Sequence, residues 1–265
     1  MTIKDLFRSA LQNAGIYLSR TVSPAEVREF ISLLRPEHAQ DRLVRVGGSD
    51  DGGYLIPDDF DGVRACVSPG VDHTASFEDD LSKRGITSYL CDYSVEGPPA
   101  YLKSFTFDKK FLGLWNDDKF LTFNSWFEKY SLLDEPGDLV LQMDIEGNEW
   151  LALASLDDEL LKRFRYVLIE LHELSDVVNP VCYRLYHQVL QKLSRHFAVA
   201  HIHPNNYTGS VSYKGMDIPR VLEVTYVRRD HLVEHHGTFQ FPHPLDEPCR
   251  PGAADLALQK IWWTS

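Results

Sequence analysis

The sequence is poor in cysteine, and its few cysteines form no recognisable framework. Its 265 residues include four cysteines, with no CxxC pair among them. Cys66 and Cys91 lie in apolar, strand-like runs. A cysteine in such a run is most often a core residue, so we expect buried free thiols in a reducing cytoplasm, not a disulfide scaffold.

Long hydrophobic runs and an excess of basic charge are also missing. No stretch approaches the ~18 uninterrupted apolar residues of a membrane helix. Residues 1–5 lack the charged-then-apolar pattern of a secretory signal, so we expect a cytoplasmic protein. The chain carries 27 basic and 39 acidic residues, a net charge of −12. This charge repels the phosphate backbone, so we expect no nucleic-acid partner, and the lack of a long apolar run predicts no membrane span.

The composition is that of a globular protein: 43% of the residues are apolar and 25% are charged. We expect one elaborated domain over residues 41–265, with a C-terminal tail, after an N-terminal helical extension over residues 1–40. A second helix of this extension begins with Ser23 as N-cap, Pro24 at the first helical position and Glu26 completing a capping box. The first helix gathers its apolar residues on one face: Ile3, Leu6, Phe7, Ala10 and Leu11.

From about residue 43 the pattern changes to strands alternating with helices. One helix is predicted from Ser76 to the stop signal Gly85, and another over 180–195 with a stripe of Val181, Leu185, Val189 and Leu193. Apolar runs predict strands over 63–67, 86–91, 138–143, 166–169, 197–202 and 221–227. Such alternation predicts an α/β fold with a mainly parallel sheet and helices on both faces.

Polar residues recur where these predicted strands end. A sheet of this kind binds ligands beyond the carboxyl ends of its strands, at the point where the strand order reverses. Chance would put one or two ionisable residues at such ends, so the larger number here indicates a functional site. The residues concerned are Ser68, Gly70, Asp92, Asp144, Glu170, His172 and His203.

The segment 46–57 is dense in glycine and acid. Its glycines permit close approach of the backbone to a ligand, which makes Gly53 and Tyr54 candidates for a cofactor-binding wall. A hairpin of the Asp-Gly-Gly type between two short strands explains the same residues. The two interpretations are compatible, and both stay open.

Gly70 and Asp92 are candidates for contact with a nucleotide-like cofactor. The sequence lacks the full GxGxxG fingerprint, but Asp92 follows the next strand about twenty residues on, where doubly wound folds place an acid that accepts hydrogen bonds from ribose hydroxyls. The alternative is a solvated aspartate at a strand end.

The run Met143–Trp150 packs three acids directly after the most apolar strand. Because a desolvated charge is costly, these carboxylates need partners, unless Asp144 or Asn148 caps the following helix. Asp144, Glu170 and His172 together could hold a divalent ion, Mg or Mn, through mixed O and N ligation. In a metal-free site, His172 or His203 would instead act as general base.

Seven motifs follow one another between about residue 45 and residue 229: GGSDDGGYLIPD, SPGVDHTASFE, CDYS, QMDIEGNEW, ELHE, HIHPNN and VLEVTYVRR. In this order they resemble the FkbM-like family of S-adenosylmethionine-dependent methyltransferases, and the tail segment PHPLDEPCRP is similar too. The resemblance implies a seven-stranded, Rossmann-like class I methyltransferase fold and methyl transfer to a hydroxyl oxygen of a sugar or polyketide. Two positions depart from the family pattern: residues 68–70 hold fewer glycines than the usual cofactor loop, and Pro204 stands where a glycine is expected.

The resemblance also implies roles for individual residues. Ser68 and Gly70 would lie in the cofactor loop, Glu78 would be the acid of the SFE segment, and Asp92 would bind ribose. Asp144 and Glu146 would be the acids of the DxEG motif.

We therefore expect an O-methyltransferase of glycan biosynthesis that uses S-adenosylmethionine and acts on a sugar, glycan or similar polyhydroxylated acceptor. Its cofactor would also contact Asp144, and its catalytic residues would be Asp144, His172 and His203. Two alternatives stay open: a metal-dependent hydrolase that uses these residues with Glu170, and a catalytically inactive methyltransferase-like binding domain.

Overall fold

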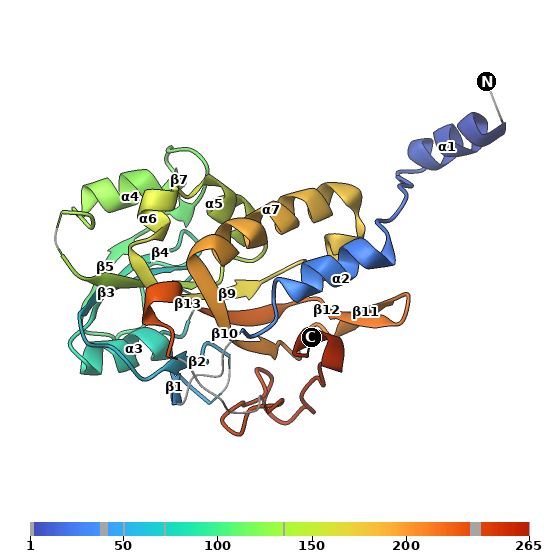
Figure 1. Cartoon of the computed structure of the whole chain (residues 1–265). Helices are drawn as coiled ribbons and strands as arrows, with labels where there is room; N and C mark the ends of the chain where they lie inside the picture. The colour runs from blue at the N-terminus through green and yellow to red at the C-terminus, as the bar shows by residue number, and fades with distance from the viewer. Residues whose placement is uncertain are drawn as a thin grey trace.

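A seven-stranded sheet forms the centre of the protein (Figure 1). The computed structural model describes residues 3–37, 42–49, 51–71, 73–134, 136–233 and 240–264. The strands of the sheet lie in the order β10-β13-β9-β8-β3-β4-β5. Their bounds are β3 (Val63–Pro69), β4 (Thr87–Cys91), β5 (Phe105–Asp108), β8 (Asp138–Met143), β9 (Phe164–Leu171), β10 (Phe197–Pro204) and β13 (Leu222–Arg228).

The sheet is mainly parallel, as the alternation of strands and helices predicts. β9, β8, β3, β4 and β5 run in one direction, and β13 is antiparallel to both of its neighbours, β9 and β10. The apolar runs predict six of the seven strands. They miss β5, because its residues are exposed or only half-buried and it has no continuous apolar run.

Helices and a hairpin cover the two faces of the sheet (Figure 1). One face is covered by α2 (Pro24–Ser32), α4 (Phe123–Lys129), α5 (Glu149–Ser155), α6 (Asp158–Leu161) and α7 (Pro180–His196). The other face is covered by α3 (Ser76–Lys83) and by the antiparallel hairpin of β1 (Leu43–Val46) and β2 (Tyr54–Pro57). The described part also contains β6 (Phe111–Leu112), β7 (Phe120–Leu121), β11 (Ser210–Tyr213), β12 (Met216–Pro219) and the 3-10 helices η1 (Leu174–Val178), η2 (Arg229–His231) and η3 (Lys260–Trp262).

The predicted helix boundaries have their expected chemistry. The Ser23 hydroxyl accepts a hydrogen bond from the Glu26 backbone N–H at 3.3 Å, and the Glu26 carboxylate accepts one from the Ser23 N–H at 2.7 Å, so the capping box of α2 is complete. The predicted stop of α3 is also present. The helix ends just before Gly85, whose φ of +79° is the left-handed conformation typical of a helix C-terminus.

The buried face of α7 differs from the predicted one. Val181 is 65% exposed, whereas Tyr186, Val189, Leu190 and Leu193 are buried. A strict four-residue spacing drifts by about 40° per step around a helix of 3.6 residues per turn. Because Val189 and Leu193 face the core, Val181 is turned away from it toward solvent. The prediction was wrong at its first residue for this reason.

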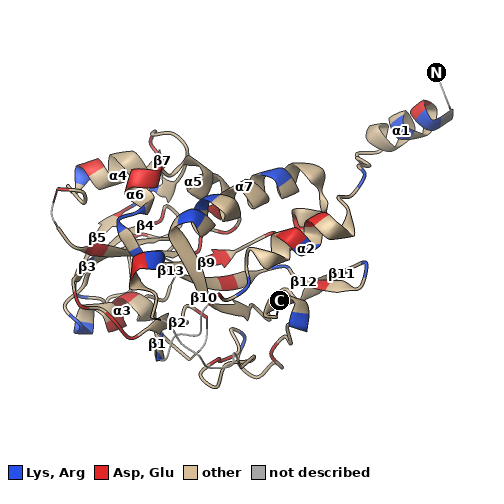
Figure 2. Cartoon of the chain, viewed as in Figure 1, with Lys and Arg blue, Asp and Glu red and all other residues tan. Residues whose placement is uncertain are grey.

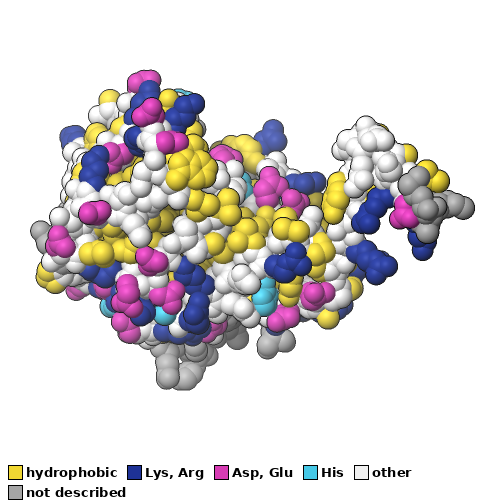
Figure 3. Space-filling model, turned by 90° about the horizontal axis from the view of Figure 1, so that it is seen from above, with side chains coloured by type: hydrophobic (Ala, Val, Ile, Leu, Met, Phe, Trp, Pro, Cys, Tyr) yellow, Lys and Arg dark blue, Asp and Glu magenta, His cyan; other side chains and the backbone are white. Residues whose placement is uncertain are grey.

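The N-terminal extension has two unlike parts. In α2, Phe30 and Ile31 are fully buried against the body. By contrast, α1 (Ile3–Asn13) stands away from the body as an arm with apolar side chains on its surface (Figures 1 and 3). Leu6 and Phe7 are 53% and 63% exposed, so the predicted apolar face of α1 contributes nothing to the core.

Cys66 and Cys91 are buried free thiols, as predicted from the apolar runs around them. Their location in β3 and β4 makes them part of the central packing. Within the described ranges, no helix is both long enough and apolar enough to cross a membrane.

Candidate functional site

Four polar residues form a row across neighbouring strands at one edge of the sheet. Glu170 on β9 lies opposite Glu223 on β13, and Glu223 lies opposite His203 on β10. On the other side of β9, Met143 pairs with Ile169, which brings Asp144 level with Glu170. We call Asp144, Glu170, Glu223 and His203 the strand-end row. The acidic arrowhead of β9 in Figure 2 lies in this row.

The predicted metal-binding triad comes together at one end of the row. Ligand atoms of Asp144, Glu170 and His172 all lie within 4.8 Å of one another. His172 Nε2 lies 3.8 Å from Asp144 Oδ1 and 3.5 Å from the carboxylate of Glu146. Asp144 Oδ1 is buried and has no hydrogen-bond partner among the described residues. A buried carboxylate oxygen in this state is suited to receive a cation or a donor group.

Burial and mutual charge perturb the pKa of all three groups. Burial raises the pKa of Asp144 to about 6, against the lowering effects of a hydrogen bond with Glu170 and the charge of His172. Burial, followed by the charge of Asp144, raises the pKa of Glu170 well above its ordinary value, because two carboxylates buried this close together cannot both ionise without a large cost. Burial alone would lower the pKa of His172, but the hydrogen bond to Glu149 and the neighbouring carboxylates outweigh it and raise it to about 9.

Glu149 holds the turn that carries Asp144. It is fully buried, and its carboxylate accepts hydrogen bonds from the backbone N–H groups of Ile145 at 2.9 Å and Gly147 at 3.0 Å. The same carboxylate lies 3.2 Å from Nδ1 of His172, which leaves Nε2 directed toward Asp144. Glu149 therefore sets the orientation of the histidine, in the way that an outer carboxylate orients a metal-binding histidine.

The capping interpretation of the acidic turn was wrong. Asn148 is at the N-cap of α5, but its side chain makes no capping hydrogen bond. The turn instead depends on two left-handed residues, Glu146 at φ +55° and Gly147 at φ +100°.

The loop after β3 and the strand end of β4 lie beside this group. Gly70 has a φ of +89°, and its N–H donates to the Cys91 carbonyl at 3.0 Å. Asp92 is only 7% exposed, and its Oδ1 accepts hydrogen bonds from the backbone N–H and the hydroxyl of Ser94, both at 2.7 Å. Asp92 is thus a buried, fixed carboxylate, and the alternative of a solvated strand-end aspartate was wrong.

Ser68, Glu78 and Tyr54 belong to a buried polar chain beneath the loop. The Ser68 hydroxyl lies 2.5 Å from Glu78 Oε1 and 2.7 Å from Gln142 Oε1, and Gln142 Nε2 donates to the Tyr54 hydroxyl at 3.2 Å. Burial raises the pKa of Glu78, against the lowering effect of the hydrogen bond that its carboxylate accepts from Ser68. These side chains support the loop from within the protein.

The glycine-rich segment forms the hairpin that the sequence analysis offered as one interpretation. A Cβ on Gly53 would lie 2.1 Å from the carbonyl oxygen of Gly48, so the two halves of the hairpin touch there. The hairpin places Tyr54 under the strand-end row, where burial and the charges of Glu170 and Asp144 raise the pKa of its hydroxyl.

His203 lies apart from Asp144 and His172. β13 and β9 separate its strand from β8. Its Nδ1 is 2.9 Å from the Glu223 carboxylate and its Nε2 is 3.0 Å from Asp255. Burial would lower the pKa of His203, but its hydrogen bonds to Asp255, Cys249 and Glu223 raise it far above the ordinary value. An imidazolium with both N–H groups engaged cannot accept a proton, which argues against His203 as the general base.

Six residues of this region were not predicted from the sequence to be site residues. They are Asp51, Glu149, Asn205, Glu223, Cys249 and Asp255. Asn205 donates to the carboxyl group of Glu170, and Asp51 lies with Glu170 and Glu223 in a second group of ligand atoms within 4.8 Å. One signal was available for Glu223: it is a lone acid inside the apolar strand β13, where an unpartnered charge is too costly to leave buried.

No family model and no curated protein matches this sequence. The resemblance to the FkbM-like family therefore stays a prediction, and the case for a function depends on the geometry of the site.

Proposed function

We propose that this protein is an S-adenosylmethionine-dependent O-methyltransferase that acts on a hydroxyl group of a sugar, glycan or similar polyhydroxylated acceptor. The observation that carries the proposal is the position of the candidate residues at the switch point of the sheet. From β3 the chain proceeds outward to β4 and β5, and then returns to β8 on the other side of β3. Gly70 and Asp144 flank this point, and ligands of doubly wound sheets bind there.

The order of the strands also supports the proposal. Numbered along the chain, the sheet runs third, second, first, fourth, fifth, seventh and sixth strand, with the seventh antiparallel. The first five positions follow the doubly wound order. An antiparallel strand inserted between the fifth and the sixth is typical of the class I methyltransferase fold that the resemblance implies.

Asp92 is suited to the cofactor. It is a buried carboxylate at the end of β4, held in one orientation by Ser94, beside the loop that carries Gly70. A fixed carboxylate there can accept hydrogen bonds from the two hydroxyls of a ribose. The methyl group of the sulfonium is already activated when the cofactor is bound, so the chain has to align the acceptor and remove its proton.

Asp144, Glu170 and His172 fit a divalent cation such as Mg or Mn. The group offers two carboxyl oxygens and one imidazole nitrogen, and Asp144 Oδ1 is buried without a hydrogen-bond partner in the described part of the chain. A bound cation would lower the pKa of an acceptor hydroxyl and orient it. Asp144 is the base nearest to the switch point in the absence of a cation, because the pKa of His172 is raised to about 9 and its imidazole is protonated at neutral pH. Glu149 fixes this imidazole with Nε2 toward Asp144.

Calorimetry with S-adenosylhomocysteine, followed by an acceptor screen with a labelled methyl donor, tests the proposal. We expect binding near one-to-one and label transfer to a polyhydroxylated acceptor. Asp61→Asn, at an exposed residue, is a matched control for variants of Asp92. Binding without transfer would favour the inactive binding domain. Absence of binding, combined with metal-dependent hydrolysis, would replace the methyltransferase with the hydrolase.

A further inference from the structure

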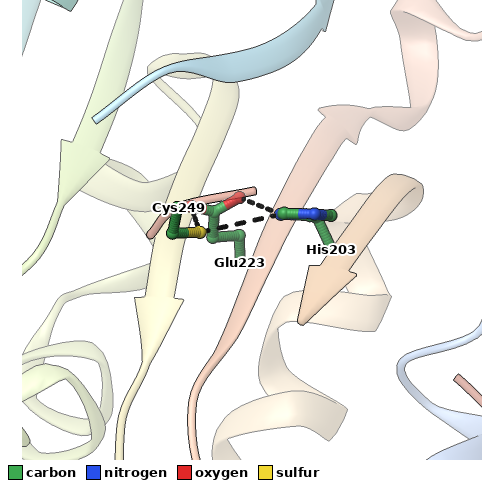
Figure 4. Close-up of side chains that lie close together, drawn as sticks. All are labelled: His203, Glu223 and Cys249. Carbon is green, nitrogen blue, oxygen red and sulfur yellow. Dashed lines mark hydrogen bonds and ion pairs between the residues drawn. The ribbon is translucent and has the colours of Figure 1, made fainter. Parts of the chain in front are cut away.

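A buried cluster of histidine, glutamate and cysteine lies at the far end of the strand-end row (Figure 4). His203 comes from β10, Glu223 from β13 and Cys249 from the C-terminal tail, and these residues are 5%, 6% and 2% exposed. His203 Nδ1 lies 2.9 Å from Glu223 Oε2, and Cys249 Sγ lies 3.3 Å from Glu223 Oε1 and 3.9 Å from His203 Nδ1. Three different metal-ligand types thus converge from distant parts of the sequence.

The distances between these atoms are close to the edges of a tetrahedral zinc site. Zinc bonds of about 2.0–2.1 Å to nitrogen or oxygen and about 2.3 Å to sulfur imply ligand separations of about 3.3 Å between N and O and about 3.6 Å to S. The three observed separations differ from these values by a few tenths of an ångström, although Glu223 meets His203 through Oε2 and Cys249 through Oε1. The carboxylate would therefore bind the ion through both oxygens or rotate to present one of them, and one ligand atom from each residue already lies within 4.8 Å of the others.

Asp255 lies where many metal sites have a carboxylate that accepts a hydrogen bond from a metal-binding histidine. Asp255 Oδ2 lies 3.0 Å from Nε2 of His203, on the side of the ring that faces away from the cluster. Histidines that bind a metal through one nitrogen commonly donate the other N–H to a carboxylate, which fixes the ring and raises its basicity. Asp255 supplies this arrangement for His203.

This cluster and the group at Asp144 offer different ligand atoms to a metal ion. Asp144, Glu170 and His172 offer oxygen and nitrogen only, a set that suits Mg or Mn, whereas a thiolate favours zinc. We propose that His203 Nδ1, the Glu223 carboxylate and the Cys249 thiolate bind a zinc ion, which fastens the C-terminal tail to β10 and β13. Binding displaces the Cys249 S–H proton and the proton on His203 Nδ1 to solvent, and a water completes the coordination.

The C-terminal tail, residues 240–264, contains little regular secondary structure that could attach it to the sheet. Over residues 240–264 it forms one short 3-10 helix, η3, and no strand. Near Cys249 it is held by a 2.7 Å hydrogen bond from the Arg250 backbone N–H to the Asn206 side chain and by a contact of Asp246 with His201 at 2.9 Å, and nearer its end by the fully buried side chain of Trp262. A metal at Cys249 would link this irregular segment directly to two strands of the sheet.

The test uses the full-length protein. Zinc content is measured by elemental analysis after the chelator-treated protein is reloaded with zinc and dialysed. We expect one zinc per chain, at least a tenfold loss of zinc affinity in Cys249→Ala, and no change in the matched control Cys182→Ala, whose half-buried thiol lies outside the cluster. If Cys249→Ala fails to fold, Glu223→Gln replaces it: this variant keeps the shape of the side chain, and we expect it to lose zinc affinity as well.

Cobalt(II) gives a second readout that does not depend on activity. Loading the chelator-treated protein with cobalt should produce a thiolate-to-cobalt charge-transfer absorption that Cys249→Ala lacks. Failure to bind zinc, or zinc bound equally well by Cys249→Ala, would show a cluster held together by hydrogen bonds alone. Zinc lost on Asp144→Asn would place the ion at the other group and also overturn the proposal. None of these results bears on methyl transfer, so the two proposals fail separately.

Discussion

A methyl group on the Cα of Gly70 would lie 1.6 Å from the carbonyl oxygen of Asp144. The loop after β3 and the turn after β8 are therefore in direct backbone contact, with no room for a side chain between them. The Asp144 N–H also points toward the Pro69 carbonyl, at 3.4 Å. This contact joins the candidate cofactor loop to the candidate catalytic turn at the point where the strand order reverses.

Replacing Gly70 with alanine should therefore lower the stability of the folded protein strongly. The new methyl group meets backbone atoms that cannot rotate away, and the φ of +89° is strained for any residue with a Cβ. Overpacking of about 1–3 kcal/mol and left-handed strain of about 1–2 kcal/mol together predict a loss of roughly 2–5 kcal/mol in the free energy of unfolding. Urea denaturation measures it.

Gly85→Ala is the matched control for this substitution. Gly85 has a similar φ of +79°, but no atom lies within 4 Å of its added Cβ. We expect only the strain of about 1–2 kcal/mol. Equal losses in the two variants would contradict a tight contact between Gly70 and Asp144.

Asp92→Asn should weaken cofactor binding without unfolding the protein. The amide oxygen of asparagine can still accept the two hydrogen bonds from Ser94, but the charge that attracts the ribose hydroxyls is gone. Hydrogen bonds to a charged group contribute about 1.5–3 kcal/mol, so calorimetry should show roughly 10- to 150-fold weaker binding of S-adenosylhomocysteine. Asp61→Asn should bind normally. Unchanged affinity in Asp92→Asn would remove Asp92 from the cofactor site.

Much of the fold could be predicted from local patterns. β8 (Asp138–Met143) was predicted with its observed bounds, because Leu139, Val140, Leu141 and Met143 make it strongly apolar and Asp144 follows it directly. The meeting of Asp144, Glu170 and His172 was predictable as well, since consecutive parallel strands end at the same edge of a sheet. β5 has no such run, and only its pairing with β4 makes it a strand.

The rest of the site could not be predicted, because it depends on pairing over long distances. His203 meets Glu223 through the register of two antiparallel strands, and it meets Asp255 and Cys249 through the course of an irregular tail. No local periodicity encodes these contacts. In the sequence analysis, His203 was grouped with Asp144 because both follow predicted strands. The insertion of an antiparallel strand between β9 and β10 belongs to the fold that the resemblance implies, but it was not used to separate the two residues.

Asp138 should be a main stabilising residue at the opposite end of the sheet. Its carboxylate lies 2.8 Å from both Arg165 and Arg228, and Arg165 is nearly fully buried. Asp138→Asn leaves the buried guanidinium of Arg165 with Asp59 as its remaining charge partner, at 3.2 Å and half-exposed, so we expect a loss of at most roughly 3–5 kcal/mol in unfolding free energy. Asp230→Asn is the control, because Asp230 contacts Arg228 from an exposed position and should cost at most about 1 kcal/mol.

The effect of Asp138 should depend on pH. Burial alone would raise its pKa, but hydrogen bonds to Arg228 and Arg165 outweigh it and hold the pKa of the folded protein below the ordinary 3.8. A lowered folded pKa stabilises the protein above the unfolded pKa, and this contribution is lost as the pH falls through the folded value. The difference between wild type and Asp138→Asn should therefore be constant above about pH 5 and shrink below pH 4. A difference that persists undiminished at pH 2 would mean that packing, not charge, explains the loss.

The last prediction concerns the charge of Asp144 and the divalent cation. Asp144→Asn preserves the shape of the turn but removes the carboxylate whose Oδ1 is buried without a hydrogen-bond partner among the described residues. Loss of a general base or of the ligand that orients the acceptor should lower turnover by roughly 10²-fold or more, while most of the cofactor affinity remains. Glu146→Gln is the matched control: Glu146 also faces His172, at 3.5 Å, but its side chain is 87% exposed.

If the cation is required, a chelator abolishes activity, magnesium or manganese restores it, and His172→Ala loses this response. Full activity of the metal-stripped enzyme would leave a metal-free site, in which Asp144 is the base because the raised pKa of His172 keeps its imidazole protonated at neutral pH. Normal turnover of Asp144→Asn would exclude the switch-point turn as the catalytic centre.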